Sequence, residues 1–206
     1  ALAGLAEASG GRLDGLVTAA GLGSTKDPAE VISTNYFGSI ALVEGCRDLL
    51  VAAGSAAVVA IGSNSATAMP GIPDEPVAAC LDGDEALACS LVSDLYCYGI
   101  AKLAITRKIR RMSHTPAWAG AGIRLNIVAP GSTETAILDE TRADPDIGPL
   151  FEAFPQPLGR NAQPDEIAAV IEFGVSEGSS FMVGSVLFAD GGVDAMLRSD
   201  DWPVSL

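Results

Sequence analysis

The sequence has few basic residues and few aromatic side chains. Its 206 residues carry 12 Lys and Arg against 26 Asp and Glu, which gives a net charge of −14 at pH 7. A surface with this excess of negative charge repels phosphate backbones and anionic lipid headgroups. The composition therefore argues against nucleic acid and membrane as partners. Acidity that only keeps the chain soluble is the alternative explanation.

The usual signatures of a metal site and of a disulfide framework are also missing. His114 is the single histidine, and the cysteines form no Cys-x-x-Cys pair, so we expect no metal. Isolated, reduced cysteines are typical of cytosolic proteins, and we expect a cytoplasmic location without a secretory signal. The isolated cysteines are Cys46, Cys80, Cys89 and Cys97.

The sequence does contain a regular alternation of apolar runs and helical segments. The alternation is typical of crossover units and a parallel sheet, and continuous apolar strands indicate helices on both faces. We therefore predict a doubly wound α/β fold, and the length suggests one domain over residues 1–206. The predicted strands are residues 15–20, 56–61, 123–128 and 185–189. The predicted helices are residues 28–50 with a break near Gly38, 95–113 and 165–173.

Polar side chains follow these strands, where a parallel sheet binds ligands. Ser63 follows the second predicted strand, and Tyr98 and Lys102 lie on the helix that leads to the third. Positions i and i+4 share one helix face, so the phenol and the ammonium can point into one pocket. A nearby cation lowers a tyrosine pKa and makes the phenol a usable general acid/base. The alternative is a packed tyrosine beside a surface lysine.

These residues belong to a longer series of motifs, which together resemble the short-chain dehydrogenase/reductase family through nearly the whole chain. NYFGS, RLNIVAPGSTET, FADGGVDAMLR and a long acidic insertion before Tyr98 resemble its bacterial hydroxysteroid dehydrogenase/carbonyl reductase branch. The motif residues, in chain order, are Asp14, Ala19-Ala20-Gly21, Asn35, Ser63, Tyr98-x-x-x-Lys102, Arg124 to Gly131, Thr135, Arg160, Gly184 and Asp190-Gly191-Gly192.

The resemblance implies a Rossmann-like, NAD- or NADP-dependent oxidoreductase that interconverts a secondary alcohol and a ketone. A 3-hydroxysteroid or a xenobiotic carbonyl is the leading substrate, and a homodimer or homotetramer is implied. Tyr98 would exchange a proton with the substrate oxygen, which Ser63 would orient. Lys102 would lower the Tyr98 pKa and hold the nicotinamide ribose, and Asn35 would hold a water in a proton relay. The implied cofactor-binding residues are Ala20, Gly21, Tyr98, Lys102, Pro130, Gly131, Thr133 and Thr135.

The sequence departs from the family at its N-terminal side, where the glycine-rich turn and the strand that selects NAD or NADP are absent. One interpretation is a piece of a longer enzyme. The other is a truncated chain without the pyrophosphate cradle, with a bare strand edge and a non-catalytic binding or regulatory role. We expect these residues alone to bind cofactor poorly. A dehydrogenase for another small alcohol is the alternative within the enzyme class.

Two segments are expected to shape substrate choice. Residues 135–155 follow a strand end and have the mixed composition of a lid. Residues 70–93 form the insertion, predicted to contain a short helix or, alternatively, a solvated excursion that alters oligomer contacts. The apolar face of that helix would be Leu81, Leu87, Leu91 and Val92. Side chains that suit either a steroid cleft or the core are Met69, Leu138, Leu150, Phe151 and Phe154.

Overall fold

The computed structural model of the chain describes residues 2–93 and 96–201. Its centre is a sheet of four parallel strands in the order β1-β2-β3-β4, so all four predicted strands are confirmed. β3 extends two residues past its predicted end, because the carbonyl of Pro130 still accepts the Asn64 N–H at 2.9 Å. The strands are β1 (Gly15–Thr18), β2 (Ala56–Ile61), β3 (Ile123–Pro130) and β4 (Val186–Ala189).

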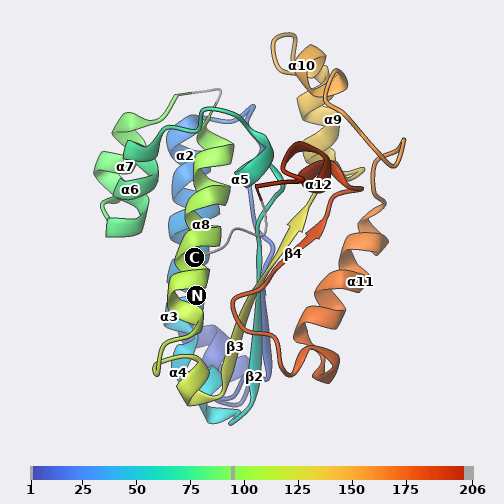
Figure 1. Cartoon of the computed structure of the whole chain (residues 1–206). Helices are drawn as coiled ribbons and strands as arrows, with labels where there is room; N and C mark the ends of the chain where they lie inside the picture. Colours follow the sequence, from blue (N-terminus) through green and yellow to red (C-terminus); the bar gives the residue numbers. More distant parts are fainter. Residues whose placement is uncertain (1, 94–95, 202–206) are drawn as a thin grey trace.

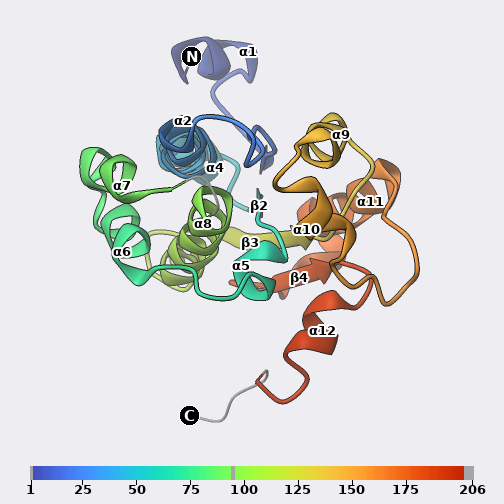
Figure 2. The ribbon, with the colours of Figure 1, turned by 90° about the horizontal axis from the view of Figure 1, so that it is seen from above.

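Helices cover both faces of the sheet, as the continuous apolar strands predict (Figures 1 and 2). On one face lie α2 (Pro28–Ile32), α3 (Ser39–Gly45), α4 (Arg47–Ala52) and α8 (Cys97–Ser113), and on the other lies α11 (Pro164–Val175). Alternate strand residues divide between the two layers. Val58 joins the buried cluster under α8, whereas its neighbour Val59 packs with Ile167 of α11. The Rossmann-like α/β fold is therefore confirmed.

The predicted helix over residues 28–50 is interrupted near Gly38, but by a π-helical turn rather than a clean break. This turn, η1 (Ser33–Gly38), separates α2 from α3 and carries the buried Asn35. π-turns within α-helices occur frequently at functional sites. The predicted helix 95–113 begins at Cys97, and Leu95 lies outside the described residues.

The insertion forms two short helices rather than one, α6 (Asp74–Asp82) and α7 (Glu85–Leu91). Gly83 ends α6 at a φ of 83°, where a side chain would be strained, and Asp84 caps α7 by accepting the Leu87 N–H at 2.9 Å. The predicted apolar face is wrong at Leu87, which is 44% exposed. The other three members of that face pack partly buried against the core.

Several short helices, among them α5, α9 and α12, lie at the carboxyl ends of the strands, which the arrowheads mark in Figure 1. Within the described residues, no helix has the length and hydropathy needed to cross a bilayer. The remaining elements are α1 (Leu2–Ala8), α5 (Ser65–Ala68), η2 (Ala119–Ala121), α9 (Ala136–Ala143), α10 (Gly148–Glu152), η3 (Glu177–Ser179) and α12 (Val193–Leu197).

Candidate active site

Ser63 and Tyr98 meet at the carboxyl edge of the sheet. Ser63 is the second residue after β2 and is 8% exposed, and Tyr98 lies in the first turn of α8. The two side chains are hydrogen-bonded. The backbone N–H of Ser65 donates to Ser63 Oγ at 3.1 Å, which fixes the orientation of the serine. The structure thus brings together Ser63, predicted from its place after a strand, and Tyr98, predicted from its helix spacing to Lys102.

Lys102 lies one turn further along α8 and is only 5% exposed. Its Nζ is 5.4 Å from the centroid of the Tyr98 ring and donates to the Ile61 carbonyl at 2.9 Å. Burial lowers the pKa of Lys102 to about 8. Among the described residues no carboxylate pairs with it, so the ammonium keeps N–H groups that can serve a ligand oxygen.

The expected lowering of the Tyr98 pKa by Lys102 is wrong for this structure. Burial raises the pKa of Tyr98 above its ordinary value of 10.0, and the hydrogen bond to Ser63 offsets only part of that rise. The phenolate loses more by leaving water than it gains from its neighbours. Tyr98 is therefore a protonated phenol at neutral pH in this state.

Asn35 holds the loop that follows β1. Its Oδ1 accepts the Leu22 N–H at 2.7 Å, and its Nδ2 donates to the Leu22 carbonyl at 2.9 Å. The side chain is 1% exposed. A Cβ added to Gly21 would lie 3.2 Å from Asn35 Oδ1, so the small residue lets the loop approach closely. Ala20 beside it is exposed at the same edge.

The other predicted cofactor-binding residues follow β3. A Cβ added to Gly131 would lie 2.7 Å from the Asp190 Cα, so glycine is required where the ends of β3 and β4 approach each other. Thr133 Oγ1 donates to the Gly131 carbonyl at 3.0 Å. Thr135 is exposed and caps α9, accepting the Leu138 N–H at 3.5 Å. These residues lie at the same edge of the sheet as Pro130.

Residues 135–155, the segment predicted as a lid, contain α9 and α10, and hydrogen bonds hold the residues on either side of the segment together. The Glu134 N–H donates to the Ala162 carbonyl at 2.9 Å, and the Ala162 N–H donates to the Ser132 carbonyl at 2.9 Å. On the other side, Glu140 of α9 pairs with Lys26 at 2.8 Å. Residues 135–155 therefore lie between the end of β3 and the loop that follows β1.

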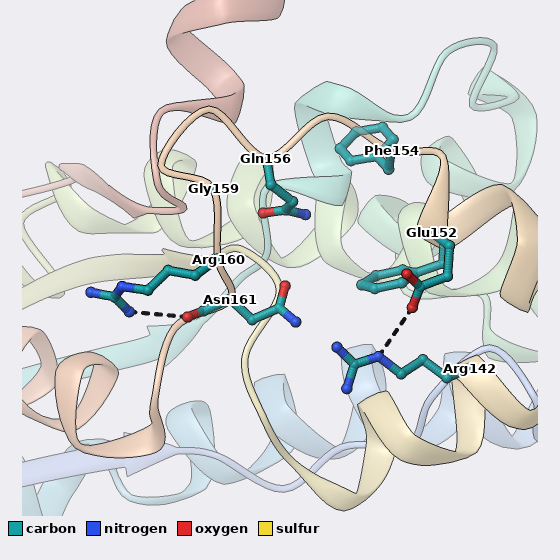
Figure 3. A pocket seen from close by; sticks show the side chains of 8 residues that line it. Arg142, Glu152, Phe154, Gln156, Gly159, Arg160 and Asn161 are labelled. Atoms are coloured by element: carbon teal, nitrogen blue, oxygen red, sulfur yellow. Dashed lines mark hydrogen bonds and ion pairs between the residues drawn. The ribbon is translucent and has the colours of Figure 1, made fainter.

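A cavity of about 180 Å³ lies between residues 142–152 and residues 154–161, and Figure 3 shows the side chains that line it. Phe151 and Phe154 line it, as do charged groups that are already paired, such as Arg142 with Glu152 at 3.2 Å. Ligand pockets are usually about 300–1,000 Å³ in volume. This cavity is too small for a steroid, and of the described residues its lining does not include Ser63, Tyr98 or Lys102.

The five side chains proposed for a steroid cleft do not form one wall in this structure. Leu138 is buried at 5% exposure, whereas Leu150 is 62% exposed. Met69 lies beside α8, where its Sδ would be 2.7 Å from a Cβ added to Gly99. Amphipathic spacing cannot separate core from cleft when both require apolar residues. Of the five, Met69 is the side chain that packs on Gly99, the residue after Tyr98.

Sequence reasoning also missed polar partners of the site. It did not find the Ile61 carbonyl beneath Lys102 or the Leu22 backbone beneath Asn35. Backbone groups leave no side-chain signal in a sequence. It also missed a contact from Asp194 to Thr67, because the two lie 127 residues apart.

The fold and the strand-edge residues define the class of the protein, a Rossmann-like α/β oxidoreductase. A family model described as enoyl-(acyl carrier protein) reductase matches residues 86–194, just over half of the chain. The chain is 39% identical over 202 residues to the 3-alpha-hydroxysteroid dehydrogenase/carbonyl reductase of Comamonas testosteroni, covering 94% of this chain and 77% of that protein. The chain belongs to the short-chain dehydrogenase/reductase family.

Two further proteins show how far the likeness extends. The solved structure of a 3-alpha-hydroxysteroid dehydrogenase from Pseudomonas sp. B-0831, complexed with NADH, has a TM-score of 0.92 and 41% identity, covering 97% of this chain and 80% of that chain. Galactitol 2-dehydrogenase of Cereibacter sphaeroides is 30% identical, and the match covers 86% of this chain but 64% of that enzyme. The predicted family and enzyme class are confirmed.

Proposed function

We propose that the protein is an NAD- or NADP-dependent reductase and dehydrogenase that interconverts a ketone and a secondary alcohol, with Tyr98 as the general acid/base. The hydrogen bond between Tyr98 and Ser63, with the Lys102 ammonium 5.4 Å from the phenol ring, carries the proposal. The Pseudomonas relative, solved with NADH, supports the cofactor. We further propose that residues 1–206 belong to a single oxidoreductase domain.

The residues at the strand edge fit a nicotinamide cofactor. Lys102 is a buried cation whose remaining N–H groups suit the hydroxyls of a ribose. Ala20 and Gly21 would let the ribose approach the loop after β1 closely, and Pro130, Gly131, Thr133 and Thr135 would hold the carboxamide side. The nicotinamide would supply or accept the hydride, and the protein would supply position and electrostatics.

In ketone reduction, Tyr98 donates its proton to the substrate oxygen while Ser63 donates a hydrogen bond to that oxygen. The Lys102 ammonium would stabilise the phenolate that remains on Tyr98, an effect smaller than that of burial, which keeps the Tyr98 pKa raised in this structure. Because the Tyr98 phenol carries its proton at neutral pH, we propose that it can act there as the acid of ketone reduction. Alcohol oxidation needs the phenolate as base, so it gains as pH rises.

Asn35 is proposed to hold a water in a relay that returns a proton to Lys102 from solvent. Its burial and its position on the π-turn η1 support this role. The side-chain amide already binds Leu22, so the relay would use the spare hydrogen-bonding capacity of the residue or its backbone.

The leading substrate is a 3-ketosteroid or another bulky carbonyl compound. We expect kcat/KM of the full-length protein, meaning the protein as it is naturally made, to be at least about 10-fold higher for a 3-ketosteroid than for a small aliphatic ketone. The steroid has more apolar surface to bury against the protein, and each Å² removed from water contributes about 25 cal/mol. Consumption of NADH and of NADPH measures both rates and the coenzyme preference. Equal kcat/KM values, or turnover of small polyols alone, would contradict the steroid assignment and favour a dehydrogenase for another alcohol.

A homodimer or homotetramer in the cytoplasm is proposed as the working form. Phe173 on α11 and Phe181 in the segment before β4 are exposed, and the described chain has no strand beyond β4. Exposed apolar side chains and an unpaired strand edge suit association with a second copy. The isolated cysteines support the location.

A further inference from the structure

A short helix connects the proposed catalytic serine to the far end of the chain. α5 (Ser65–Ala68) follows Ser63 directly and has only one turn. A helix this short is not stable by itself, because nucleation fixes several residues for one hydrogen bond. The place of α5 is therefore set by its tertiary contacts. Those contacts are with α8 on one side and α12 on the other.

Asp194 of α12 makes a side-chain hydrogen bond to α5. Its Oδ1 accepts a hydrogen bond from the Thr67 hydroxyl at 2.6 Å. The same oxygen accepts hydrogen bonds from Arg198 Nε at 2.9 Å and from Arg198 Nη2 at 2.7 Å. Asp194 is 7% exposed, so its charge lies in a region of low dielectric. Hydrogen bonds to an ionised acceptor there are roughly twice as strong as bonds between neutral groups.

Asp194 is in turn fixed to the end of β4. Its backbone N–H donates to Asp190 Oδ2 at 2.7 Å, and Asp190 Oδ1 accepts the Gly192 N–H at 3.0 Å. Asp190 is 8% exposed. A chain of hydrogen bonds therefore runs from the sheet through Asp190 and Asp194 to Thr67 on α5.

On its other side, α5 leads to the first turn of α8. Met69, the residue after α5, packs so closely on Gly99 that a Cβ there would lie 2.7 Å from its Sδ. Gly99 is the neighbour of Tyr98. A shift of α5 would therefore move Ser63 and Met69 together with respect to the Tyr98 phenol.

We propose that Thr67 and Asp194 are positioning residues that hold α5, and through it Ser63, in register with Tyr98. The inference rests on the proposed function, since it concerns the catalytic geometry of that site. The bond from Ser63 to the substrate oxygen matters most as charge develops on that oxygen. Loss of the Thr67–Asp194 contact should therefore lower kcat more than it raises KM.

The test is Thr67→Val, which removes the hydroxyl and keeps the shape of the side chain. In the full-length protein we expect kcat for ketone reduction to fall roughly 10-fold, with KM within about 3-fold of wild type. Thr67→Ser restores the hydroxyl and should recover most of kcat. The stoichiometry of NADH binding, measured by fluorescence, normalises the rates to folded protein.

The matched control is Thr115→Val. Thr115 Oγ1 lies 2.8 Å from the carbonyl oxygen three residues back, and Thr67 Oγ1 lies 3.1 Å from the carbonyl oxygen in the same relative position. It follows the other end of α8, more than about 20 Å from Tyr98 at 1.5 Å of rise per helical residue. The kcat of the Thr115→Val variant should equal that of wild type. If Thr67→Val does not fold, Asp194→Asn replaces it, with an expected loss in kcat of about 3-fold from the weaker acceptor.

The proposal is overturned if kcat of Thr67→Val stays within 2-fold of wild type, if only KM changes, or if Thr67→Ser restores nothing. Where Asp194→Asn is the test, an unchanged kcat overturns it. Tyr98→Phe is assayed in parallel. If Tyr98→Phe remains active, the proposed function fails. If it is inactive while Thr67→Val keeps full kcat, the positioning inference alone fails.

Discussion

Replacing Tyr98 by phenylalanine is expected to lower kcat roughly 10³-fold, because a positioned acid/base contributes about 10²–10⁴-fold. The substitution removes one hydroxyl, which Ser63 contacts, and keeps the ring that lies near Lys102. The fold and the binding of NADH should therefore survive. The measurement is kcat for ketone reduction, with circular dichroism and NADH fluorescence as checks on folding and binding.

Tyr96→Phe is the matched control. Tyr96 lies two residues earlier and is partly buried against the core, and the residue four positions on is Ile100 rather than a lysine. We expect it to retain activity within a few-fold of wild type. Turnover by Tyr98→Phe within 10-fold of wild type would mean that another group moves the proton.

Replacing Lys102 by methionine is expected to remove activity and to stabilise the fold at pH 7. The ammonium is 5% exposed, and the difference between its ordinary pKa of 10.5 and about 8 corresponds to about 3 kcal/mol. Methionine has a similar length and no charge. It loses the hydrogen bond to the Ile61 carbonyl, which costs about 1 kcal/mol, so we expect a net gain of about 2 kcal/mol in the free energy of unfolding. The loss in kcat should be at least about 10²-fold.

The stability gain from Lys102→Met should depend on pH. The folded wild type disfavours the charged lysine, so the cost of burial is fully present below pH about 8. Between about 8 and 10.5 the unfolded chain binds more protons than the folded chain, so wild-type stability rises relative to the variant. Urea unfolding at pH 7 and pH 10 measures the difference in the free energy of unfolding between Lys102→Met and wild type. This difference should be smaller at pH 10.

Lys108→Met is the control for Lys102→Met, since Lys108 lies on the same helix. Lys108 pairs with Glu44 at 3.4 Å near the surface, where an ion pair is worth about 0–1 kcal/mol. Its substitution should change neither activity nor stability by a large amount. A Lys102→Met protein that is less stable than wild type at pH 7, or that keeps a tenth of its activity, would contradict the assigned role and burial of Lys102.

Most of the sheet was predictable because buried parallel strands are continuous apolar runs. β2 (Ala56–Ile61) matches its predicted bounds, and its neighbours Val58 and Val59 face opposite layers. The conformation of local turns was less completely predictable from the sequence. The spacing indicated an irregularity near Gly38, but a π-turn and an α-helix differ only in hydrogen-bond register, which sequence periodicity does not resolve.

The proton-handling residues were predictable because helix spacing and strand ends are local properties. Tyr98 and Lys102 share a face by their separation of four residues, and Ser63 follows a strand. The effect of burial on their pKa values was not predictable, because it depends on how all surrounding elements pack. Contacts such as Thr67 to Asp194 depend on tertiary structure in the same way.

The most direct measurement of the central claim is the fate of the hydrogen transferred to the substrate. The full-length protein is incubated with a 3-ketosteroid and NADH or NADPH in which both hydrogens on the reactive carbon are deuterium, and the product is analysed by mass spectrometry. The account predicts one deuterium on the alcohol carbon with wild type, and almost no product with Tyr98→Phe. Absence of labelled alcohol from the wild type with every carbonyl compound tested would contradict the account and favour a binding role for this fold.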